Sequence, residues 1–364
     1  MSQLRAARLE RSWTQIQLAA RLAAVAAREG QSIPRPELLN STISRWENGK
    51  AEPDATYRRW LEHVFGEDIF DASRSSGQPA FVLTSMLEQS QFGVEQATDH
   101  LRRQVQVVRE LDGSLGAPAA LNQARTLLDD ANNRLMFSLN PEDRRRMAMV
   151  IADLASLVGW QLLDAGDVRT AWVSFEQAKA AAREAGDSAL LAHAMGEQSF
   201  ALIDAGRCGD AVALIRAANH ESELPKRLVA WLAAAEAEAL SGLGEATEAR
   251  QRLRDAEQGL PSAGDEQLTP YLRLDDANLA RWRGHTLAQL LDPAAGPELR
   301  ASLASVQGRF GRAEAGVLVD LAAVAFREAD QETGRLHISQ AKRVSIRTGS
   351  VRQQRRIAAL QRAA

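Results

Sequence analysis

Apolar side chains recur at helical spacing along nearly the whole chain, and no segment alternates in the way that a half-buried strand would. In the first 70 residues this pattern predicts four helices. Thr14 is a suitable N-cap for the second helix, and Gly49 is a suitable stop for the third. Ile43 and Trp46 form the apolar stripe of the third helix, which we expect to face a small core. The sequence therefore predicts a compact all-helical domain over residues 1–70.

The chain changes character immediately after this domain. Residues 71–80 are small and polar and include Gly77 and Pro79, which interrupt regular structure. Such a composition is typical of a linker between domains. Helical periodicity then resumes and continues over residues 81–364.

A repeat organises this second part of the chain. Gly166, Gly206 and Gly244 each fall in a turn between helices, at spacings of 40 and 38 residues. Around each glycine, a small residue recurs seven positions before and five positions after, and a large apolar residue recurs nine positions after. Small residues allow antiparallel helices to cross closely, and the large residue fills the space to the next repeat. The spacing predicts five or six helical hairpins stacked into a right-handed superhelix.

The polar side of the third helix carries groups suited to reading DNA. A helix in the major groove contacts base edges with side chains near its N-terminus, and the start of the neighbouring helix holds phosphate through its amide groups. The alternative is an ordinary helical hairpin whose polar side chains face only water. The candidate DNA-binding residues on this helix are Asn40, Ser41, Thr42, Ser44 and Arg45.

This N-terminal segment resembles the Cro/Xre-type helix-turn-helix family. The resemblance lies in Trp13-Thr14-Gln15, in Leu18-Ala19-Ala20-Arg21-Leu22 and in the run from Thr42 to Gly49. It implies a base contact for Arg45, which can donate two hydrogen bonds to guanine, and phosphate contacts for Gln15 and Lys50. The segment departs from the family in the longer connection over Val25–Leu39.

The repeats resemble the tetratricopeptide repeat, and the whole chain resembles bacterial, including actinobacterial, regulators that join such an array to a Cro/Xre-type helix-turn-helix. The resemblance implies an α-solenoid whose concave surface is lined by the first helix of each repeat. Aromatic side chains mixed with acids and amides suit a peptide or a polar small molecule, with the acids facing a cationic or hydrogen-bonding group. The alternative is that these side chains pack between helices. The candidate effector-binding residues are Trp160, Phe200, Asp204, Trp231, Glu238 and Asn278.

Composition and charge narrow the class of protein. Residues 1–66 contain ten Lys/Arg and seven Asp/Glu, whereas the whole chain has a net charge of −3. A basic head on an acidic body suits DNA contact at one end. No apolar run approaches the ~18 residues that a membrane helix needs, the first residues do not form a secretion signal, and the single Cys208 excludes an intramolecular disulfide. These features predict a cytoplasmic protein without membrane contact.

The sequence contains no convincing catalytic or cofactor-binding set. The six histidines are scattered without metal-ligand spacing, and neither a phosphate-binding loop nor a nucleophile elbow is present. We therefore expect neither an enzyme nor a bound metal or cofactor. The basic final helix, residues 352–362, is expected to be a solvated cap of the array rather than a second DNA-binding arm.

The leading hypothesis is a transcriptional regulator that binds double-stranded operator DNA as a homodimer. Its helical array would bind an effector, dimerise, or do both. The alternative is a scaffold protein whose array binds another protein and whose helix-turn-helix does not read DNA.

Overall fold

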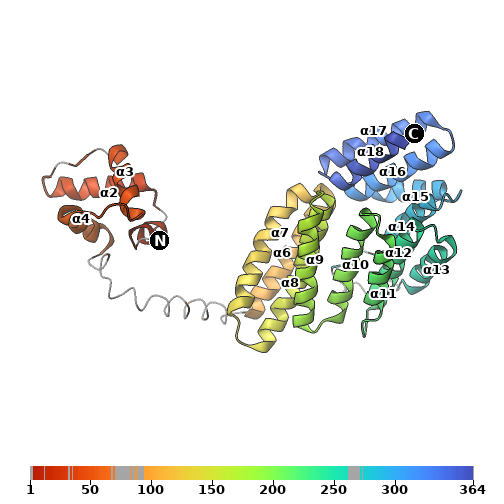
Figure 1. Cartoon of the computed structure of the whole chain (residues 1–364), viewed down its shortest axis with the longest axis horizontal. Coiled ribbons are helices and arrows are strands. Elements are labelled where there is room, and N and C mark those ends of the chain that lie inside the picture. The colour runs from red at the N-terminus through yellow and green to blue at the C-terminus, as the bar shows by residue number, and fades with distance from the viewer. Residues whose placement is uncertain are drawn as a thin grey trace. The chain divides into compact units, whose positions relative to one another are not determined.

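The computed structural model describes residues 3–66 apart from Ser12, Ser32 and Arg35, the single positions 69, 83 and 87, and then residues 94–260 and 271–363 apart from Arg273. Within these residues every regular element is an α-helix, as the periodicity predicts. The chain separates into two compact units, Met1–Met86 and Leu87–Ala364 (Figure 1). The segment predicted as a linker, residues 71–80, lies outside the described residues.

The first unit is built from four described helices. Thr14 caps α2 in a capping box, because its hydroxyl accepts from the Gln17 amide while the Gln17 side chain accepts from the Thr14 amide. Gly49 ends α3 at φ +67°, which lets the Lys50 amide donate to the Arg45 carbonyl. The predicted cap and stop are thus both confirmed. The helices are α1 (Gln3–Glu10), α2 (Gln15–Arg28), α3 (Pro36–Glu47) and α4 (Ala55–Phe65).

A single apolar core joins these helices. Ile43 is fully buried and Trp46 is buried in contact with Tyr57 of α4, so the stripe predicted on α3 faces inward. Leu18 and Leu22 meet it from α2. Burying these side chains leaves the opposite side of α3 to solvent.

The second unit is a succession of packed helices. Its elements are α6 (Val94–Leu115), α7 (Ala117–Phe137), α8 (Pro141–Asp164), α9 (Val168–Ala185), α10 (Ser188–Asp204), α11 (Cys208–Asn219), α12 (Lys226–Gly242), α13 (Ala246–Gly259), α14 (Asp276–Gln289), α15 (Ala295–Val306), α16 (Gly311–Arg327), α17 (Gln331–Arg347) and α18 (Val351–Ala363). Neighbouring helices pack in pairs, such as α8 with α9, α12 with α13 and α16 with α17. Figure 1 shows these pairs side by side.

The repeating small and large residues lie where helices cross. A Cβ on Gly159 would lie 2.6 Å from the ring of Phe175, so only glycine fits between α8 and α9 at this point. Ser199 and Ala237, the corresponding small residues of the next two repeats, are fully buried. The corresponding large residue Ile215 is fully buried as well. The spacing read from the sequence therefore reflects close helix packing.

The end of the second unit returns to its beginning. Helix α16 packs against α6, and α18 packs against α8. Ser350 donates to Asp164 at 2.6 Å across 186 residues, and Arg312 of α16 bonds to Asp112 of α6. The expectation that the final helix is only a solvated cap is wrong for Arg352, whose side chain is 17 % exposed and bonds to Asp204. An extended array would leave its lining surface open, whereas these contacts close it.

Candidate functional site

The outer side of α3 gathers most of the residues predicted to contact DNA. Ser41, Arg45 and Lys50 are exposed, whereas Asn40, Thr42 and Ser44 are half-buried. Ser44 is also held by Asn48, whose side-chain amide donates to the Ser44 carbonyl at 2.8 Å. The sequence reading did not select Leu38, which is 69 % exposed near the start of the same helix. An exposed leucine there could have been noticed as an apolar residue outside the buried stripe.

Glu47 fixes the end of α3. Arg8 of α1 donates to both its carboxylate oxygens, at 2.6 and 3.0 Å, and Gln15 donates to it at 2.7 Å. Burial raises the pKa of Glu47, but the hydrogen bonds from Arg8 and Gln15 outweigh this effect and lower it. The side-chain amide of Gln15 therefore joins the start of α2 to α3. Three helices are held in one geometry by this buried charge cluster.

The second unit contains a cavity of about 670 Å³. Its lining comes mainly from the even-numbered helices α6 to α18, so alternate helices form an inner layer and the others an outer one. All the residues predicted to bind an effector line it, namely Trp160, Phe200, Asp204, Trp231, Glu238 and Asn278. These residues lie together because they come from α8, α10, α12 and α14, which all contribute to the inner layer.

Aromatic rings form one wall of the cavity. Phe200 packs edge-on against Trp160 at 5.7 Å between ring centroids and stacks on Trp282 at 6.3 Å. Trp231 meets Trp282 at 6.1 Å. Phe200 and Trp231 are nearly fully buried. They can touch a ligand only through the ring edges that face the cavity.

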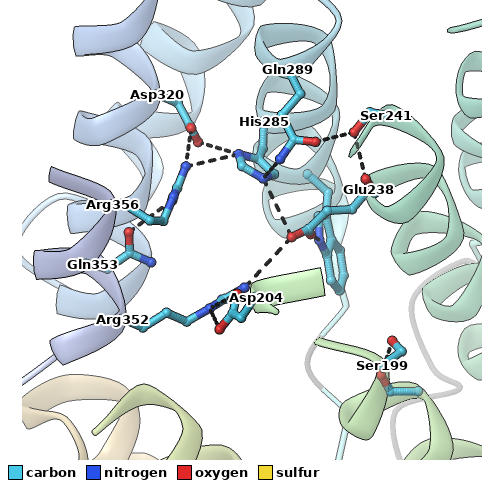
Figure 2. Close-up of polar contacts among 12 residues, drawn as sticks. Ser199, Asp204, Glu238, Ser241, His285, Gln289, Asp320, Arg352, Gln353 and Arg356 are labelled. Carbon is cyan, nitrogen blue, oxygen red and sulfur yellow. Dashed lines mark hydrogen bonds and ion pairs between the residues drawn. The ribbon is translucent and has the colours of Figure 1, made fainter. Parts of the chain in front are cut away.

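Ionic groups that also line the cavity bond to one another (Figure 2). They lie beside the rings, because the Arg352 guanidinium carbon is 5.6 Å from the Trp160 ring centroid. His285 Nδ1 lies 2.9 Å from an Asp320 oxygen, and Arg356 Nη2 donates to the other Asp320 oxygen at 2.5 Å. Trp282 Nε1 donates to Glu238 at 2.7 Å, and His285 Nε2 lies 3.6 Å from the second Glu238 oxygen. His285 thus lies between two carboxylates contributed by α12 and α16.

The charges of this cluster support one another. Burial lowers the pKa of His285, but Asp320 and Glu238 together raise it to about 9. Burial raises the pKa of Glu238, but His285 and the hydrogen bond from Trp282 contribute to lowering it to about 2. The pKa of the base is raised and that of the acid is lowered, so each group favours the charged form of the other.

The prediction that Asp204 and Glu238 are free to bind a cationic ligand is wrong, because both carboxylates are paired within the protein. Arg352 donates to both oxygens of Asp204, at 2.9 and 2.7 Å, and Glu238 is paired as described above. The sequence reading missed Asp320, His285, Arg352 and Arg356 because the return of α16 and α18 is a long-range event. One signal was available: Arg352 and Arg356 are one turn apart on one helix face.

Among the described residues, no group of three or more His, Cys, Asp or Glu side chains could hold a metal ion. Cys208 is buried, and burial raises its pKa. Helix α8 is long and apolar enough to cross a membrane, but most of it is buried inside the second unit.

No family model matches the chain, and neither a curated protein nor a solved structure is measurably similar to it.

Proposed function

We propose that this protein is a DNA-binding transcriptional regulator, with a Cro/Xre-type helix-turn-helix in the first unit and a tetratricopeptide-like, effector-binding array in the second. The observation that carries the proposal is the two-sided character of α3. Its inner side is apolar and buried, its outer side exposes Ser41 and Arg45, and its end is anchored through Glu47. A helix that recognises DNA needs to be held rigidly by its own domain and to present a free polar surface to the groove.

In this proposal α3 enters the major groove of double-stranded DNA. Leu38, near the start of α3, offers an apolar contact for a thymine methyl group, and Arg45 donates to a guanine edge from the last turn of this short helix. Lys50 and the first amide groups of α2 hold phosphates. The Gln15 side chain already donates to Glu47. In this proposal Gln15 therefore both orients α2 and lies close to the DNA phosphates.

The second unit supplies control. Its cavity of about 670 Å³ is within the range of roughly 300–1,000 Å³ that small-molecule sites occupy. Two half-sites one DNA turn apart are read together only when a homodimer holds two reading helices ~34 Å apart. A ligand that binds one arrangement of the array more tightly shifts the population of DNA-competent dimers.

The proposal is tested by incubating the full chain with sheared genomic DNA of its source organism and sequencing the retained fragments. We expect enrichment of fragments sharing a two-fold-symmetric sequence, with retention that falls steeply as salt rises because phosphate contacts release counterions. A folded protein that enriches no sequence over unrelated DNA would contradict the proposal and favour a protein-binding scaffold.

A further inference from the structure

Arg281 is a half-buried cation without a hydrogen-bonded counterion among the described residues. It lies on α14 and lines the cavity. Its guanidinium makes no hydrogen bond or ion pair with any described residue, and its Nε atom is buried without a partner. The ring of Trp282 lies 5.4 Å from its guanidinium carbon. Withdrawing part of a guanidinium from water is costly unless something else supplies an acceptor.

The neighbouring carboxylates do not supply that acceptor. Glu238 is taken by Trp282 and His285, and Asp320 is taken by His285 and Arg356. Burial lowers the pKa of Arg281, and together with the nearby Arg352 and Arg356 it outweighs the opposite effect of Glu238 and Asp320. Around Arg281, four basic side chains (Arg281, His285, Arg352 and Arg356) face three carboxylates (Asp204, Glu238 and Asp320), so this cluster has one basic group in excess.

A row of rings leads away from Arg281 along the cavity. Trp282 is followed by Trp231 at 6.1 Å, by His193 at 5.4 Å and by Tyr271 at 4.7 Å. His193 is 3 % exposed; its Nε2 lies 3.5 Å from a Glu197 oxygen, whereas its Nδ1 has no partner in the described structure. The Tyr271 hydroxyl also lacks one. Polar groups that are buried without partners at the far end of an aromatic row match a ligand with a second polar group.

We propose that the cavity binds a small, flat organic monoanion whose acid group pairs with Arg281. The body of the ligand lies along Trp282 and Trp231, and a hydroxyl or amine at its far end bonds to His193 and Tyr271. A single negative charge fits, because the cluster has one basic group in excess. A planar guanidinium receives a carboxylate or sulfonate through two parallel hydrogen bonds.

This inference rests on the proposed function only in calling the ligand an effector. Binding is measured without DNA, so its failure and the failure of DNA recognition are separate results. The probe is 8-anilinonaphthalene-1-sulfonate, an aromatic monoanion whose fluorescence rises in apolar surroundings. Its matched partner is N-phenyl-1-naphthylamine, which has the same rings without the sulfonate.

The expected result is that Arg281→Met weakens binding of the sulfonate by about 10- to 100-fold, the value of one charged hydrogen-bonding partner. Binding of the neutral probe should change by less than about 3-fold by the same scale, because the aromatic wall is intact. Arg335→Met removes an exposed arginine on α17 and should change neither. The Arg281→Met protein should melt no lower than the parent, because it loses a half-buried charge that has no hydrogen-bonded partner.

The proposal is overturned if the parent binds no sulfonate, if Arg281→Met leaves the sulfonate affinity unchanged, or if both probes lose affinity equally. Arg281→Lys keeps the charge but not the planar fork, and should retain part of the preference for the sulfonate. If Arg281→Met does not fold, the Arg281→Lys variant replaces it in the test. Equal loss of affinity for the sulfonate and for the neutral probe in that variant would contradict the proposal.

Discussion

Replacing Asp320 by alanine should lower the free energy of unfolding by about 3–5 kcal/mol, the cost of removing one partner from a buried ion pair. Asp320 is 6 % exposed and is the acceptor for both His285 and Arg356. Its loss leaves His285 and Arg356, whose side chains are 12 % and 30 % exposed, with one fewer carboxylate between α14, α16 and α18. Urea unfolding monitored by circular dichroism measures the change. A loss below about 1 kcal/mol, the usual size for an exposed pair, would mean that the cluster does not hold these helices together.

The pH dependence of stability provides a second readout of the same cluster. The folded pKa of His285 is about 9, above its ordinary value of 6.5. Its contribution is therefore complete below pH 6.5 and is lost as the pH rises through 9, a decrease of roughly 3 kcal/mol. In Asp320→Ala this decrease between pH 7 and pH 10 should be much smaller. Glu332→Ala, which removes an exposed carboxylate of α17, should retain the slope of the parent.

Gly116→Ala should destabilise the second unit by about 3 kcal/mol or more, because the turn between α6 and α7 meets the end of α17 through backbone. Gly116 has φ +87°, and a Cβ there would lie 2.1 Å from the carbonyl oxygen of Thr348. A backbone oxygen cannot rotate away as a side chain can. The strain would therefore act on the contact that closes the unit.

Gly206→Ala is the matched control for this substitution. Gly206 has φ +72°, but nothing lies within 4 Å of the added Cβ. It should lose only the roughly 1–2 kcal/mol that a left-handed conformation costs an alanine. Equal losses in the two variants, measured by thermal and urea unfolding, would show that the contact with Thr348 is unimportant.

Most of the helices could be predicted from local features of the sequence. The start of α2 at Thr14 and the end of α3 at Gly49 could be predicted from the sequence, because helix capping depends on neighbouring residues alone. The small and large positions around Gly166 likewise report how adjacent helices pack. The effector candidates converge for the same reason: alternate helices of a regular array face one side.

What the sequence could not give is the closure of the second unit. Contacts such as Arg352 with Asp204 join residues 148 positions apart, and no local periodicity encodes that distance. Because these long-range contacts could not be predicted, Asp204 and Glu238 were expected to be free acids and the final helix was expected to be a solvated cap. The missing counterion of Arg281 is likewise visible only in the folded structure, when all neighbours are in place.

The central claim is that α3 reads DNA through its exposed side, and Arg45→Ala tests it most directly. Anisotropy of a labelled fragment enriched by the parent should show affinity weakened by roughly 1–3 kcal/mol, about 5- to 150-fold, with a relaxed sequence preference. Arg335→Ala removes the same charge from an exposed site on α17 and should bind like the parent. Equal affinity of Arg45→Ala and the parent for that fragment would contradict the account.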